Sequence, residues 1–163
     1  MKAMRVLVLL VALAAGCASP APSPSPSPTS VQPEPNPALV AFEGHIAEAI
    51  TREGQLVRQL AATSAGTNAE LGAAARLIEQ WAINETAWLK TNPAEPCFAE
   101  AANAWEAGIS DIGTSAAAFI ALAAAPSPPT DAEGQAAGAR LASGTESLEQ
   151  AATLARSARV ACR

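Results

Sequence analysis

The chain has 163 residues, half of them hydrophobic but only three Trp, three Phe and no Tyr, so it supports one domain with a small, alanine-rich core. Its formal net charge is −5, from 10 Lys and Arg against 15 Asp and Glu residues. This acidic balance argues against a nucleic-acid-binding surface, because there is no basic patch to neutralise phosphates.

The first 16 residues have the pattern of a secretory signal peptide. Residues 1–5 carry two positive charges, and residues 6–15 form an apolar run that is too short for a transmembrane helix of about 20 residues. The run ends in the sequence LAAGC at residues 13–17, which resembles the lipobox of bacterial lipoproteins. This resemblance implies that Cys17 becomes the lipidated first residue of the mature chain and anchors it, extracytoplasmically, to a membrane. It implies no activity.

Residues 17–37 are interpreted as the lipid-bearing cysteine followed by a spacer. Residues 19–37 consist largely of proline and serine, and proline pushes the residue before it into extended geometry. Alternating Ser-Pro therefore favours a semi-rigid polyproline II rod that reaches about 60 Å at most. The composition also allows a PxxP ligand or a glycosylated stalk, but next to a lipid anchor we interpret it as a spacer.

The folded domain is expected at residues 38–163, and its first half contains two predicted helices. Apolar residues recur at intervals of three and four after Asn36-Pro37, a capping residue followed by a proline that fits the first helical position. A second such pattern follows residues 67–70, which have the sequence of a capping box, and stops at Asn92-Pro93.

The second half contains two more predicted helices. One runs without a break from Pro96 to the prolines at 126, 128 and 129. The other follows a second capping box at residues 130–133 and reaches Cys162. No stretch alternates with a period of two, so no sheet is expected. Four long helices with short connections predict an all-α, antiparallel up-down-up-down four-helix bundle.

Glycines are frequent at the start of the fourth predicted helix. Gly134, Gly138 and Gly144 make this region intrinsically weak as a helix, but they also allow a neighbouring helix to approach closely. The region is therefore expected either to fray or to form a docking surface for a partner helix.

The cysteines provide an independent test of this topology. Cys97 opens the third predicted helix and Cys162 closes the fourth, so in an antiparallel hairpin the two lie side by side. With Cys17 assigned to the lipid, they are the two cysteines that remain, and an exported location is where disulfides persist. We therefore predict a Cys97–Cys162 disulfide.

Candidate chemistry is sparse, because the chain has one histidine, His45, through which any catalytic triad or multi-histidine metal site would have to pass. Counting helical levels places His45 opposite Glu85, and Glu85 opposite Asn103, which predicts a polar layer across the bundle. Glu43 and Glu48 flank His45, but the Glu-x-x-His pairs of di-iron bundles are absent. The simpler interpretation is that His45 is a rim residue and Glu85 an isolated seam acid that sets helix register and meets solvent or a hydrogen-bond partner. No metal or cofactor is predicted.

The three tryptophans lie on the apolar stripes of the predicted helices, and one acid, Glu53, interrupts a stripe. Trp81 and Trp88 share a face of the second predicted helix, and Trp105 falls level with Trp81. Aromatic residues in phase with a helix stripe are normally core, although Trp81 and Trp105 would alternatively line a slot for an apolar ligand. Glu53 interrupts the first stripe, and the same counting places Arg76 within its reach.

These features favour a membrane-anchored cell-envelope lipoprotein whose bundle has a non-catalytic role, binding an envelope protein or organising the envelope. The alternative is a bundle that binds a small ligand or a metal, through Trp81 and Trp105 or through His45 and Glu85. An enzyme is the third interpretation, and it would need a solvent-open cleft with convergent acids. A cavity lined by the named residues would favour the second.

Overall fold

The structure is a computed structural model that describes residues 34, 36–63, 66–125 and 131–162, with residue 131 for its backbone alone. The predicted signal peptide, Cys17, nearly all of the spacer and Thr130 of the second capping box lie outside these residues. The elements are α1 (Pro37–Ala62), α2 (Asn68–Thr91), a short 3₁₀ helix η1 (Pro96–Phe98), α3 (Ala99–Ala124) and α4 (Asp131–Ala158).

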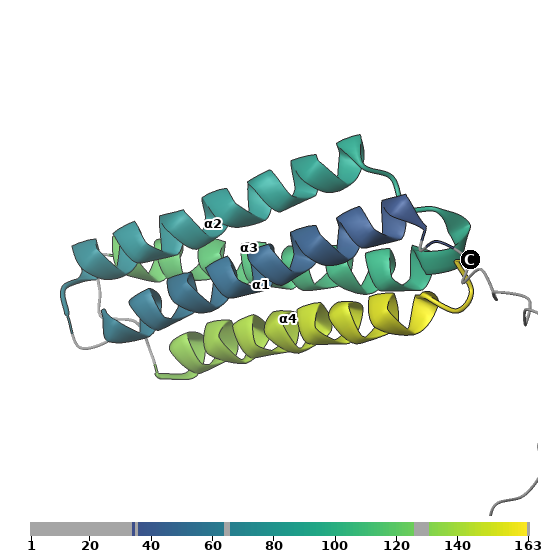
Figure 1. Cartoon of the computed structure of the whole chain (residues 1–163). Helices are drawn as coiled ribbons and strands as arrows, with labels where there is room; N and C mark the ends of the chain where they lie inside the picture. Colours follow the sequence, from purple (N-terminus) through teal and green to yellow (C-terminus); the bar gives the residue numbers. More distant parts are fainter. Residues whose placement is uncertain (1–33, 35, 64–65, 126–130, 163) are drawn as a thin grey trace, which may run out of the picture. The chain divides into compact units, whose positions relative to one another are not determined.

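The four long helices lie side by side, and successive helices run in opposite directions (Figure 1). The described residues contain no strand, so the predicted all-α, up-down-up-down four-helix bundle is confirmed. By backbone proximity α3 lies closest to α4 and α2, whereas α1 stands further from its neighbours, α2 and α4.

Local sequence sets the starts of the first two helices. The Asn36 side-chain oxygen accepts hydrogen bonds from the N–H groups of Ala38 and Leu39, at 2.9 and 3.1 Å, and so satisfies donors that the first turn leaves free. At α2 the Thr67 hydroxyl accepts from the Glu70 N–H, and the Glu70 carboxylate accepts from the Thr67 N–H. The predicted capping box is therefore confirmed, and the Thr67 N–H lowers the pKa of Glu70.

The third helix differs from the prediction at its start, where η1 precedes α3 instead of a continuous α-helix. Pro96 opens the 3₁₀ turn, where its missing N–H costs nothing, and Phe98 is buried at its end. The segment Pro96–Ala124 is also the one helical segment among the described residues that is long and apolar enough to cross a membrane. Within the bundle it packs against both α2 and α4.

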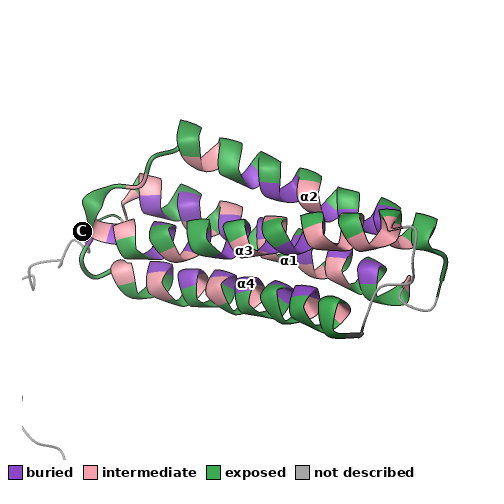
Figure 2. Cartoon of the chain, turned by 180° about the vertical axis from the view of Figure 1, so that it is seen from behind, coloured by how far each residue is buried: buried purple, intermediate pink, exposed green. Residues whose placement is uncertain are grey.

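Buried side chains form inward-facing stripes on all four helices (Figure 2). Among the residues that the structure describes, three buried ones are polar or charged: Glu53, Glu85 and Ser115. The largest completely buried apolar side chains are those of Trp105, Leu39, Ile46, Ile78, Ile112 and Leu148. The core is thus built from a few large side chains separated by many alanines, as the composition predicted.

The backbones of α3 and α4 touch at a pair of glycines. A Cβ atom at Gly108 would lie 2.9 Å from the carbonyl oxygen of Gly144, and a Cβ atom at Gly144 would lie 2.9 Å from that of Gly108. The predicted close approach is therefore confirmed for Gly144. Gly134 and Gly138 have no atom within 4 Å of an added Cβ, so these two glycines do not serve helix packing.

The start of α1, the α2–α3 connection and Cys162 lie at the same end of the bundle. Cys97 and Cys162 form the predicted disulfide, with their Cα atoms 5.4 Å apart. At the same end the Asn36 side-chain amide donates a hydrogen bond to the Glu95 carboxylate at 2.8 Å, which ties the start of α1 to the α2–α3 connection. We call this end, where Asn36 and the disulfide lie, the closed end.

Candidate functional site

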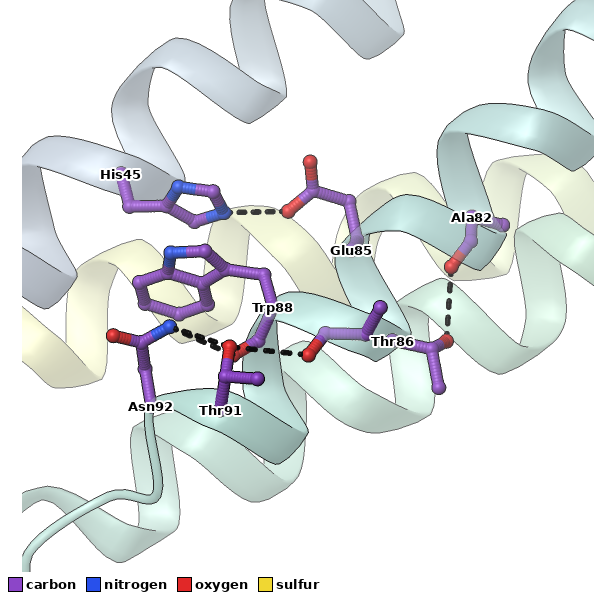
Figure 3. A network of polar contacts seen from close by, with 8 residues as sticks. His45, Ala82, Glu85, Thr86, Trp88, Thr91 and Asn92 are labelled. Atoms are coloured by element: carbon purple, nitrogen blue, oxygen red, sulfur yellow. Dashed lines mark hydrogen bonds and ion pairs between the residues drawn. The ribbon is translucent and has the colours of Figure 1, made fainter.

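The predicted contact between His45 on α1 and Glu85 on α2 is present (Figure 3). His45 Nε2 lies 2.6 Å from Glu85 Oε2, and the side chains retain 25% and 10% of their exposure. With Glu85 ionised its oxygens only accept, so the proton of this hydrogen bond lies on Nε2. The pair links α1 to α2, which approach each other less closely than α2 and α3 do.

Trp88 completes this arrangement, which we call the histidine stack. The imidazole of His45 lies parallel to the indole of Trp88, with 3.6 Å between ring centroids and 2° between planes (Figure 3). Trp88 also contacts Phe42, with 6.0 Å between the ring centroids. The sequence had placed Trp88 in the core stripe with Trp81, whereas it is half-buried and holds the histidine ring in one plane.

The acids next to His45 in sequence do not join it. The Glu43 carboxylate accepts three hydrogen bonds from the Arg159 guanidinium, at 2.7 to 3.0 Å, and so links α1 to the chain just after α4. Glu48 is exposed. Among the described residues no cluster of three or more His, Cys, Asp or Glu side chains is placed to hold a metal ion.

Asn103 does not belong to the predicted polar layer, and in this respect the level counting was wrong. Its side chain is exposed and lines a surface hollow between α2 and α3. The reason is helical phase, because Ala101, Ala102 and Trp105 are the buried positions of this turn and leave position 103 on the outer face. The layer therefore links α1 to α2 alone.

Trp81 and Trp105 pack edge to face in the core, with centroids 6.4 Å apart and planes at 72°. Both are buried, as the core interpretation predicted, and neither indole N–H has a hydrogen-bond partner among the described residues. Four surface hollows of about 320 to 630 Å³ are present on the described part of the chain. None of these four is lined by Trp81, Trp105, His45 or Glu85.

Glu53 is a second buried acid, with 2% of its surface exposed, and it faces α4. Thr145 Oγ1 donates a hydrogen bond to Glu53 Oε1 at 2.8 Å. Burial raises the pKa of Glu53, an effect that the Thr145 hydrogen bond partly offsets. The sequence had suggested Arg76 on α2 as its neighbour and missed Thr145, whose signal was a hydroxyl in the otherwise small and apolar stripe of α4.

Comparison with protein-family models, with curated proteins and with solved structures finds no match for this chain. A functional conclusion therefore has to come from the residues themselves.

Proposed function

We propose that this chain is a membrane-anchored lipoprotein of the cell envelope whose helical bundle has a non-catalytic role, binding a protein partner or organising the envelope. The observation that carries the proposal is the pairing of the cysteines. The chain has three, and the structure joins Cys97 to Cys162, which leaves Cys17 alone at the end of a charged and apolar leader. A disulfide between the ends of a helical hairpin also fits an oxidising, exported location.

The spacer would enter the folded domain at the same end of the bundle as the disulfide. Residue 36, where the spacer joins the folded domain, lies at the closed end and is hydrogen-bonded to Glu95, two residues before Cys97. The bundle would thus be held at its covalently reinforced end, which leaves the sides of α2, α3 and α4 available to a partner. A non-catalytic role is supported by the one histidine, whose Nε2 is engaged by Glu85.

Intact-mass measurement of the full-length protein, expressed with its own leader, tests the anchor. We expect a mass that starts at Cys17 and includes acyl chains, with two additional thiols that alkylate only after reduction. The matched control is Cys17→Ser, which should remove the lipid and leave the disulfide intact. A wild-type mass without lipid, or thiols that alkylate before reduction, would contradict the proposal.

A small-ligand-binding bundle is the second candidate, for one reason. The indole N–H groups of Trp81 and Trp105 are buried donors without an acceptor among the described residues, and a ligand with a hydrogen-bond acceptor would satisfy them. Titration with an apolar carbonyl compound should then quench or shift tryptophan fluorescence, and replacing Trp81 with Phe should abolish the change. No change in wild-type fluorescence at saturating probe would contradict this candidate.

A further inference from the structure

A groove runs along the surface between α2 and α3. Gly72 lies against Ala123, and Gly113 against Ala82, so the two helices are close there, and they diverge toward the end of α2 at Thr91 (Figures 1 and 2). The space between them is a groove of about 630 Å³, which shares Thr86 and Lys90 with an adjoining hollow of about 320 Å³. We call the two together the α2–α3 groove.

The middle of the groove is uncharged and partly apolar. Ile83 is 56% exposed on its rim, an unusual position for a large aliphatic side chain in a domain with so small a core. The other lining residues of the larger hollow are small or neutral apart from its two ends: Ala82, Thr86, Ala87, Ile109, Ser110, Gly113, Thr114 and Ala117. Such a lining fits the ridge of another helix.

The charges of the groove stand at its ends. Glu79 lines one end, and Lys90 lines the other, where Glu106 also lies. Within the part of the chain that the structure describes, none of these three side chains has an ion-pair partner. Lys90 is also the one lysine of the chain after Lys2.

This arrangement is complementary to itself. Glu79, Ile83, Thr86 and Lys90 lie on one stripe of α2, at helical intervals of three and four residues. If a second α2 lies antiparallel along the groove, about a two-fold axis at the middle of the stripe, Glu79 meets the partner's Lys90 and Ile83 meets the partner's Thr86. The contact forms twice in the pair, so each Glu79 faces a Lys90 of the other copy.

We propose that the α2–α3 groove binds a second copy of this chain, as an antiparallel two-fold dimer. The inference names a partner for the binding role proposed above and rests on that role, but not on the lipid anchor. Confinement of two lipidated chains to one membrane would raise their effective concentration and so favour a modest interface.

Zero-length carbodiimide crosslinking of the full-length protein in detergent tests this contact. Equal amounts of unlabelled and ¹⁵N-labelled chains are mixed, so that a link between two copies is recognised by its mixed isotopes. Glu79 and Lys90 of one chain are separated by eleven residues of helix, about 16 Å, and cannot be joined directly. A mixed-isotope Glu79–Lys90 link is therefore expected, and links from Lys90 spread evenly over the exposed acids of the other copy would overturn the proposal.

Charge exchange provides a second readout by analytical ultracentrifugation. E79K should weaken dimerisation by about tenfold, because two exposed ion pairs become two repulsions. The double variant E79K/K90E should restore it to within about threefold. E146K is the matched control, with the same charge change at an exposed position of α4, and it should leave dimerisation unchanged. A protein that stays monomeric throughout, or equal losses for E79K and E146K, would overturn the dimer and leave the mass test of the anchor unaffected.

Discussion

The contact between α3 and α4 and the contacts of α1 are built on opposite principles. At α3–α4 two backbones touch because Gly108 and Gly144 have no side chains, and a disulfide joins the start of one helix to the end of the other. α1 stands further from its neighbours and supplements its buried apolar stripe with three polar links: Glu43–Arg159, His45–Glu85 and Glu53–Thr145. Adding atoms should therefore destabilise the α3–α4 contact, whereas removing side chains should destabilise the contacts of α1.

The largest expected effect is loss of the disulfide on the α3–α4 side. Replacing Cys97 and Cys162 together with alanine removes the link across 65 residues and should cost up to about 4 kcal/mol of unfolding free energy, mainly by freeing the unfolded chain. Urea unfolding monitored by circular dichroism measures the loss. A loss below about 1 kcal/mol would mean that the α3–α4 contact is held by packing alone.

Adding one methyl group at the glycine contact should come next. In Gly144→Ala the new Cβ lies 2.6 Å from an Ile112 side-chain carbon and 2.9 Å from the Gly108 carbonyl, so the helices must separate, at a cost of about 1–3 kcal/mol. Gly138→Ala is the matched control on the same helix, with nothing within 4 Å of its Cβ. It should instead gain about 0.5–1 kcal/mol from helix propensity. Equal effects in thermal unfolding of the two variants would contradict the close contact.

Removing a side chain from α1 should destabilise the protein less, and it should do so by deleting contacts and not by adding a steric clash. His45→Ala deletes the stacking on Trp88 and leaves the largely buried Glu85 carboxylate without its partner, for a loss of about 1–2 kcal/mol. Changing Glu85 to leucine in the same chain removes the stranded charge and should recover part of the loss. If the double variant is less stable than His45→Ala by as much as Glu85→Leu alone destabilises the wild type, the two side chains are not coupled, and this prediction is wrong.

The smallest effect should be a gain, at Glu53. Because burial raises the folded-state pKa above its ordinary value of 4.5, the contribution of Glu53 to stability is fully present below that value and is lost as the pH rises through the raised one. Glu53→Gln keeps an acceptor for Thr145 without a charge to bury, so it should stabilise the protein at pH 7.5 by at most about 1 kcal/mol. At pH 4 the gain should vanish in the same urea experiment.

The sequence predicted the elements whose causes are local. The cap at Asn36 and the box at Thr67–Glu70 are decided within one turn of chain, and the period of the apolar residues shows which face each helix buries. The disulfide followed from topology, and the His45–Glu85 contact from counting levels across a single short connection.

The errors arose where a side chain's direction depends on how far apart the helices stand. Asn103 is level with the polar layer but faces outward, and Glu53 contacts Thr145 on α4 instead of Arg76 on α2. The stacking of Trp88 on His45 was also missed, because the apolar period placed Trp88 in the core stripe with Trp81 and does not give the orientation of the indole. The distance between two helices depends on how both pack together, so it cannot be read from the apolar period or the composition of either one.

The position of Asn36 also decides how the bundle would respond to mechanical force. Tension along the chain before Pro37 enters the fold at the first turn of α1, and it acts to peel that helix away from α2 and α4. Glu43–Arg159 and His45–Glu85 lie within the first three turns, where such a force would be felt first, while the disulfide keeps the start of α3 and the end of α4 together. We expect α1 to detach before the rest of the domain opens, so the polar links near its start, together with the buried Leu39 and Phe42, set the force that this end of the molecule can bear.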